Sequence, residues 1–248
     1  MTPQELYTLL MEHRAKILPL IHQRCNSTVI SGPFKGMKIL PKYCWGDGDT
    51  AGKLLGLYED ELYPTIEEEI TKNHDLVVNY GCAEGFYGIG MAMRLPTTPV
   101  VLFDREQIAL DVAKENANVN GVTNIEYTLQ CNFPYIEGLL SKYKNPFIIM
   151  DCEGAEDIVL DPIQLPSLVK TTVLVETHDC LRQGITDRIV HKFNETHDMF
   201  SIIQGTKNVY IDPIHDLSDT DKWILNNENR PSTMMWVHMI PRTNNESI

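Results

Sequence analysis

One stretch, residues 75–95, limits what this chain of 248 residues can fold into more than any other. The apolar run Leu76–Val78 predicts a buried strand, and it leads into a turn with glycines at positions 81, 85 and 88. Helix-forming residues follow from Ile89 until Pro96 stops them. An open α/β sheet uses a strand, a glycine-rich turn and a helix in this order to place a nucleotide at the carboxyl ends of its strands.

The spacing of these glycines distinguishes between classes of nucleotide. Gly81 allows a sharp turn off the strand, and Gly85 allows the backbone to approach a ligand without an intervening Cβ. The pattern is G-x-x-x-G-x-x-G, because position 83 is alanine. It therefore differs from the G-x-G-x-x-G of dinucleotide-binding enzymes and disfavours NAD.

The charge of the chain excludes some partners. The formal net charge is −13 and the sequence pI is about 5.0. Because proteins that bind nucleic acids or anionic membranes without specificity need a basic surface, neither is expected as a main partner here. The hydrophobic fraction of 43% is sufficient for a real core.

The cysteine pattern and the N-terminus favour a cytoplasmic protein. The six cysteines are scattered without a C-x-x-C pair, which indicates free thiols in a reducing compartment. The first residues contain neither a basic nor an apolar signal segment, and no apolar run approaches the ~18 residues of a membrane span.

Residues 1–72, which precede the glycine turn, predict two helices with short strands and a polar segment between them. An amphipathic helix is expected over 3–24 with a break at Pro19, followed by one or two short strands within 28–40. The polar, glycine-rich segment 43–53 is either a surface turn cluster or a mobile loop near a ligand. A helix over 61–72 should carry Glu67, Glu68 and Glu69 on a solvated face.

The rest of the chain alternates between strands and helices. Strands are expected at 76–78, 99–105, 125–129, 147–150, 172–175, 200–203 and 232–240, and helices at 106–120, 135–143, 184–195 and 219–225. This order predicts a seven-stranded, mostly parallel, Rossmann-like α/β sheet that ends in an antiparallel hairpin and has helices on both faces. We expect an accessory segment at 1–60 and one compact domain at 61–248.

Polar residues follow the expected strands at their carboxyl ends. Asp104 ends the second strand about 20 residues past the glycine turn, where a carboxylate accepts hydrogen bonds from ribose hydroxyls. The alternative for Asp104 is an N-cap of the next helix. After the third strand, Gln130, Cys131 and Asn132 could contact an adenine.

Several of these motifs resemble one family. The turn Asn79–Tyr87 is similar to motif I of class I S-adenosylmethionine methyltransferases, and Ala83–Tyr87 is more narrowly similar to the FkbM-type methyltransferases. The run Asp151–Glu156 resembles that family's D-x-E-G-A-E signature, and Glu176–His178 resembles its E-x-H motif. The segment Gly56–Glu59 is similar to its G-x-Y/F-E, and Arg230-Pro231 with Trp236 fits its last strand. The resemblance covers residues 53–240, although Asn79 stands where the family has an acid.

The resemblance implies a function and a set of site residues. It implies S-adenosylmethionine as cofactor, a hydroxyl of a small molecule, sugar or secondary metabolite as acceptor, and catalysis by His178, Asp151 and Glu176. The cofactor residues it implies are Tyr58, Glu59, Asn79, Gly81, Cys82, Ala83, Glu84, Gly85, Phe86, Asp104, Arg105, Gln130, Cys131, Asn132 and Asp151.

The sequence leaves alternatives open for the general base, for a metal ion and for the function itself. His178 is the first choice for general base because its ordinary pKa is nearest neutrality. Asp151, Glu176 and His178 could instead bind a divalent metal that acidifies the acceptor hydroxyl. The competing functions are an NAD-dependent Rossmann oxidoreductase and a non-catalytic S-adenosylmethionine-binding protein. The oligomeric state is open, with a dimer among the alternatives.

Overall fold

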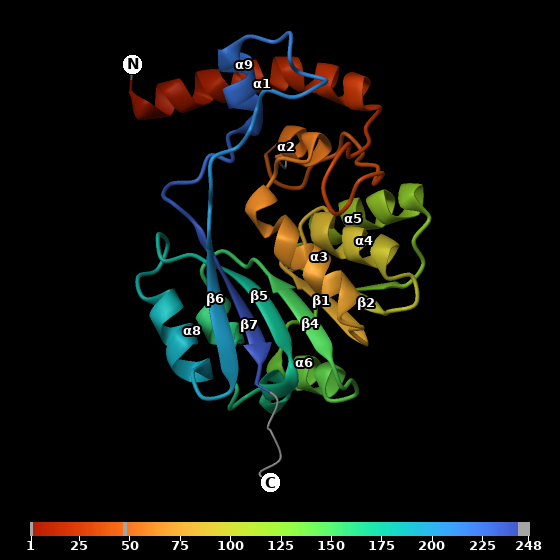
Figure 1. The fold of residues 1–248 in the computed structure, drawn as a ribbon, viewed down its shortest axis with the longest axis vertical. Coiled ribbons are helices and arrows are strands. Elements are labelled where there is room, and N and C mark those ends of the chain that lie inside the picture. Colours follow the sequence, from red (N-terminus) through yellow and green to blue (C-terminus); the bar gives the residue numbers. More distant parts are fainter. Residues whose placement is uncertain (1, 47–48, 243–248) are drawn as a thin grey trace.

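A seven-stranded sheet forms the centre of the molecule (Figure 1). The structure is a computed structural model that describes residues 2–46 and 49–242, so Asp47 and Gly48 of the polar loop lie outside the described residues. The strands are β1 Leu76–Tyr80, β2 Val100–Phe103, β3 Ile125–Thr128, β4 Pro146–Met150, β5 Thr172–Thr177, β6 His197–Ile203 and β7 Met235–Pro241.

The strand order is β3-β2-β1-β4-β5-β7-β6. The first five strands pair in parallel, whereas β7 runs antiparallel to both β5 and β6. The predicted Rossmann-like, mostly parallel sheet with a C-terminal antiparallel hairpin is confirmed. The order reverses direction at β1, so β1 and β4 border the crevice where open α/β sheets bind ligands.

Helices cover both faces of the sheet. They are α1 Pro3–Cys25, α2 Thr50–Leu55, α3 Tyr63–Thr71, α4 Phe86–Arg94, α5 Gln107–Asn120, α6 Phe133–Leu140, α7 Glu156–Val159, α8 Ile185–Phe193 and α9 Asp219–Asn226, with 3-10 turns at Asp60–Leu62 and Pro166–Lys170. No helix among the described residues has the length and apolar character needed to cross a membrane.

Alternate residues of each central strand enter different cores, because a strand directs successive side chains to opposite faces. Val77 packs with Leu54, Ile66 and Phe86 on one face, whereas Val78 packs with Ile136 and Ile189 on the other. Both faces are therefore buried, as a parallel sheet requires.

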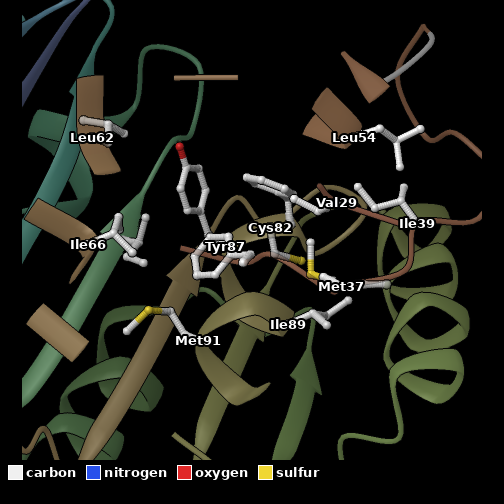
Figure 2. Packing of buried hydrophobic residues seen from close by; sticks show 14 of the residues in the cluster. Val29, Met37, Ile39, Leu54, Leu62, Ile66, Cys82, Tyr87, Ile89 and Met91 are labelled. Carbon is white, nitrogen blue, oxygen red and sulfur yellow. The ribbon is translucent and has the colours of Figure 1, made fainter. Parts of the chain in front are cut away.

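The N-terminal segment shares the first of these cores. Figure 2 shows Val29, Met37 and Ile39 packed beside Cys82 and Ile89 of the glycine turn and α4. Helices α1, α2 and α9 contact one another and lie beyond the carboxyl edge of the parallel strands (Figure 1). The N-terminal helix thus meets the segment between β6 and β7 above the sheet.

Two expectations for the N-terminal region are wrong. Helix α1 continues through Pro19, since Pro19 and the Ala15 carbonyl that it leaves unbonded both lie on the exposed side. The strands expected within 28–40 reduce to one bridge between Thr28 and Lys38. The reason is that the amides of Lys38 and Leu40 bond to the side chains of Asn120 and Asn116 on α5 instead.

The solvated face expected for α3 is also wrong at Glu69, whose side chain is fully buried. Glu69 lies three residues after the buried Ile66 and therefore on the same helix face. Its carboxylate is 2.7 Å from His74 Nε2 and 2.9 Å from Lys72 Nζ. It is also 2.9 Å from Nε2 of His238 on β7, so Glu69 ties α3 to the sheet.

We expect Glu69→Gln to lower the free energy of unfolding by roughly 1.5–3 kcal/mol at pH 7, because hydrogen bonds to a buried charge are lost. Urea denaturation measures this value. Glu68→Gln, on the exposed face of the same helix, is the control and should change it by less than about 0.5 kcal/mol. Equal effects of the two substitutions would contradict a structural role for Glu69.

The pH dependence has a definite sign. Burial would raise the pKa of Glu69, but hydrogen bonds from His238, His74 and Lys72 outweigh it and hold the pKa well below its usual range. The contribution is therefore complete above the unfolded-state pKa of about 4.3 and is lost as the pH falls toward the folded-state pKa. We expect the wild type to lose stability below about pH 5 more steeply than Glu69→Gln.

Candidate functional site

A cavity of about 290 Å³ lies at the carboxyl ends of β4 and β5. Asp151 and Glu153 follow β4, Glu176 ends β5, and His178 comes directly after it. The lining residues are Asp49, Tyr58, Asp151, Glu153, Glu176, His178, Cys180, Leu181, Glu228, Asn229, Arg230, Pro231 and Met234. All three residues predicted to be catalytic are therefore in one cavity, with Tyr58 from the cofactor set.

The glycine turn packs against one side of this site. Gly81 has a φ of +74°, and a Cβ there would lie 1.7 Å from the Asp151 carbonyl oxygen. The Gly81 and Cys82 amides both donate to the Phe103 carbonyl at 2.9 Å. The turn is thus fixed between β2 and β4, and only glycine fits at its first position.

Asp104 reaches the same turn from the end of β2. Its Oδ2 accepts a hydrogen bond from the Ala83 amide at 3.0 Å, and its Oδ1 accepts one from the Glu106 amide at 2.9 Å. The second bond is a local turn contact, and the alternative that Asp104 is the N-cap of the next helix is wrong, because the N-cap of α5 is Glu106. The first links the ends of β1 and β2, as expected for the edge that holds a ribose.

Several of the other predicted cofactor residues have internal partners. Asn79 Oδ1 accepts from the Gly88 amide at 3.0 Å, which ties β1 to the first turn of α4. The buried Glu84 carboxylate forms an ion pair with Lys53 of α2, and Phe86 belongs to the core. Gly85 has a φ of +89° and stands at the N-terminus of α4. Cys82 is buried in the same core.

The residues after β2 and β3 are more open. Arg105 and Gln130 are exposed, and Cys131 is half-buried. Asn132 is the N-cap of α6, because its side chain accepts a hydrogen bond from the Tyr135 amide. These positions lie on the far side of Asp104 from the cavity in strand order, where the adenine end of a nucleotide is expected.

A buried cation holds the other side of the cavity. Arg230 forms ion pairs with Glu59 and Glu176, which come from distant parts of the chain, and with Glu228, two residues before it. Glu59 also accepts a hydrogen bond from the Tyr87 hydroxyl. Its carboxylate is fully buried and directed at Arg230, so Glu59 supports the cavity wall from behind.

His178 lies among four carboxylates. Its Nδ1 is 2.7 Å from Glu156 Oε1, and its Nε2 is 3.6 Å from Asp151 Oδ1 and 3.4 Å from Glu153 Oε2. Glu176 Oε2 is 3.5 Å from the same nitrogen.

The pKa values of this group shift in a direction that matters for proton transfer. Burial raises the pKa of Asp151 to about 7, against the opposing charge of His178. For His178, burial lowers the pKa, but the hydrogen bond with Glu156 and the charge of Asp151 raise it further, above its ordinary value. The surrounding carboxylates therefore favour the protonated form of His178, whereas burial favours the neutral form of Asp151.

Sequence analysis did not find every residue of the site. It included Asp49 and Lys53 only in a segment that could lie near a ligand, gave no role to Cys180 or Glu228, and placed Arg230 only by its resemblance. The signal that could have identified Arg230 as their partner is that buried acids such as Glu59 and Glu176 require a cation. Glu153 and Glu156, which the sequence marked only as part of the run Asp151–Glu156, both contact His178.

Comparisons with known proteins give a likeness of fold only. No protein-family model matches the chain, and no curated protein does. A cofactor-bound structure of Rv0187 from MTB is 12% identical, with 78% of this chain and 94% of that one covered at a TM-score of 0.47. A ribosomal protein L11 methylase from Lactobacillus delbrueckii subsp. bulgaricus is 14% identical, with 74% and 78% covered at a TM-score of 0.46.

An rRNA methylase from Streptococcus thermophilus is 12% identical, with 73% of this chain and 96% of that chain covered at a TM-score of 0.44. Values this low do not transfer a substrate or a cofactor.

We expect Gly81→Ala to lower the free energy of unfolding by more than the roughly 1–2 kcal/mol that a left-handed alanine alone costs, because the new Cβ meets backbone. Gly138→Ala is the control, since nothing lies within 4 Å of a Cβ at that helical position. It should raise stability by about 0.5–1 kcal/mol. Thermal unfolding of both variants measures the difference, and a tolerated Gly81→Ala would show that the turn is not tightly packed.

Proposed function

We propose that this chain is an S-adenosylmethionine-dependent methyltransferase. The observation that supports it most is the turn after β1, where Gly81 packs on the Asp151 carbonyl and Asp104 accepts the Ala83 amide. This places a side-chain-free backbone and a strand-end carboxylate next to the catalytic cavity. The glycine spacing disfavours a dinucleotide at the same position.

The residues present fit this cofactor. A carboxylate can accept about four hydrogen bonds, and amides take up only two on Asp104, so two remain for a ribose diol. Gln130 and Cys131 are accessible at the adenine end, and Tyr58 borders the cavity at the other. The cofactor supplies a methyl group on a sulfonium, and the sulfur keeps the electron pair of the broken C–S bond.

The cavity residues would act on the acceptor. Arg230 fixes the Glu176 carboxylate in place, so Glu176 can orient an acceptor hydroxyl by accepting its hydrogen bond. Asp151, with a pKa of about 7, takes up the hydroxyl proton when His178 is protonated. His178 is the second choice for this step, as a neutral imidazole.

The acceptor is proposed to be a small molecule with a hydroxyl group. A volume of about 290 Å³ is of the order of small-ligand pockets. Its wall carries five acidic side chains, Asp49, Asp151, Glu153, Glu176 and Glu228, and the chain as a whole carries −13. Because phosphates would be repelled, we propose neither a nucleic acid nor a membrane surface as partner, and a cytoplasmic location.

The FkbM-type methyltransferases are the family that we propose within this class. The motifs at 83–87, 151–156 and 176–178 support it, and each meets the turn or the cavity. Residues 1–60 are proposed to form an accessory cap on the domain at 61–248. The contacts of α1 and α2 with α9 beyond the strand ends support this division.

The first test is cofactor binding. We expect S-adenosylhomocysteine to bind with a dissociation constant in the micromolar range by calorimetry, and NAD to give no heat. Asp104→Asn should weaken this binding about tenfold or more, because a hydrogen bond to a charged group contributes roughly 1.5–3 kcal/mol. Asp111→Asn, at an exposed position on α5, is the matched control and should bind as the wild type does. Binding of NAD without S-adenosylhomocysteine would sink the proposal.

The second test is turnover. Release of S-adenosylhomocysteine is measured with a panel of sugars, phenols and other hydroxylated compounds until an acceptor is found. His178→Ala should then lower the rate about 100-fold or more while leaving S-adenosylhomocysteine affinity within about twofold, since the residue serves the acceptor. His191→Ala, at an exposed position on α8, is the control. An unchanged rate in His178→Ala would show that His178 has no catalytic part.

A further inference from the structure

Three side chains at the cavity wall present ligand atoms to a common point. One carboxylate oxygen each of Asp151 and Glu153 and one ring nitrogen of His178 lie within 4.8 Å of one another. The sequence grouped Asp151 and His178 with Glu176 as metal ligands. In the structure Glu153 completes the group, while Glu176 is ion-paired with Arg230.

Two atoms in this group lack the partners that burial requires. The His178 side chain is only 5% exposed, and its Nε2 is 3.4 Å or more from the carboxylate oxygens around it. At those distances it makes no hydrogen bond with any described residue. Asp151 Oδ1 is likewise buried without a hydrogen-bond partner. A buried carboxylate oxygen without a hydrogen-bond partner, 3.6 Å from an imidazole nitrogen that is not hydrogen-bonded either, indicates a missing ligand.

The other nitrogen of His178 is held in the way that metal-binding histidines are held. Glu156 is fully buried, and its Oε1 lies 2.7 Å from Nδ1 while accepting the Gly154 amide at 2.9 Å. A proton on Nδ1 that is donated to Glu156 leaves the lone pair on Nε2 directed at Asp151 and Glu153. A carboxylate behind the imidazole both orients the ring and raises its strength as a ligand.

The donor set selects the kind of ion. Imidazole nitrogen favours transition metals, whereas carboxylates alone would suit Mg²⁺ or Ca²⁺. An ion about 2.1–2.2 Å from each ligand atom bridges atoms up to about 4.4 Å apart, and His178 Nε2 lies 3.6 Å from Asp151 Oδ1 and 3.4 Å from Glu153 Oε2. The Glu153 side chain is 74% exposed and can adjust its position by rotation.

We propose that Asp151, Glu153 and His178 bind one divalent transition-metal ion, of the Mn²⁺ or Fe²⁺ type, with Glu156 as the positioning residue behind His178. The site faces the cavity, so its remaining coordination positions are open to the acceptor. Its role in the reaction rests on the proposed function and replaces proton uptake by Asp151. The ion binds and acidifies the acceptor hydroxyl, whose proton leaves to water, and the resulting oxygen attacks the methyl carbon while the cofactor sulfur keeps the electron pair of the C–S bond.

The test uses Mn²⁺ with the metal-stripped full chain, followed by calorimetry and electron paramagnetic resonance. One tight Mn²⁺ per chain is expected, with nitrogen modulation of the Mn²⁺ signal from coordinated imidazole. Glu156→Gln should weaken Mn²⁺ binding roughly 10- to 100-fold without removing a ligand. Asp198→Asn, an exposed acid outside the group, is the control and should change nothing.

The outcomes separate the metal site from the proposed function. Weak binding of several Mn²⁺ ions, unchanged in Glu156→Gln and without nitrogen modulation, would overturn the site as adsorption to an acidic surface. The wild-type spectrum decides the matter even if a variant fails to fold. S-adenosylhomocysteine binding in EDTA is measured in parallel, because its retention with no Mn²⁺ site would leave the methyltransferase proposal standing and remove only this one.

Discussion

The buried guanidinium of Arg230 is the interaction on which the site depends. Three carboxylates converge on it: Glu59 and Glu176 from segments far away in sequence, and Glu228 from its own segment. Breaking such a cluster by removing its cation typically costs about 3–5 kcal/mol, because uncompensated charges stay buried. Arg230 therefore fixes the chain between β6 and β7 to the end of β5 and to the segment before α3.

A second buried pair does the same for the glycine turn. Lys53 of α2 binds Glu84, and the Asn116 side chain of α5 donates to the Glu84 carbonyl at 3.1 Å. The turn that Gly81 starts is thereby held by both the N-terminal segment and the helix after β2. The N-terminal segment is part of how the site is built as well as a cover over it, which explains why its apolar residues share a core with α4.

The sequence predicted the fold well because its signals are local. Strands such as Phe147–Met150 are continuous apolar runs, and Gly121 ends α5 in the left-handed conformation expected of a C-cap. Asp151, Glu176 and His178 could be found for the same reason, since carboxyl ends of adjacent parallel strands meet at one edge. The pairings of Arg230 with Glu176 and of Glu69 with His238 could not be predicted, because tertiary packing brings these partners together across more than fifty residues.

Asn79 departs from the family pattern for a physical reason. The resemblance has an acid at this position, and a charge there would be buried beside the neutral first turn of α4. The amide oxygen of Asn79 instead accepts the Gly88 amide at 3.0 Å, so it serves a helix N-terminus that has few other acceptors. An uncharged oxygen is sufficient for this bond and avoids the desolvation of a carboxylate. The carboxylates Asp104 and Asp151 instead follow the two strands that flank β1. Asn79 therefore supports the turn, whereas Asp104 and Asp151 carry the negative charge that a cofactor and a metal ion would meet.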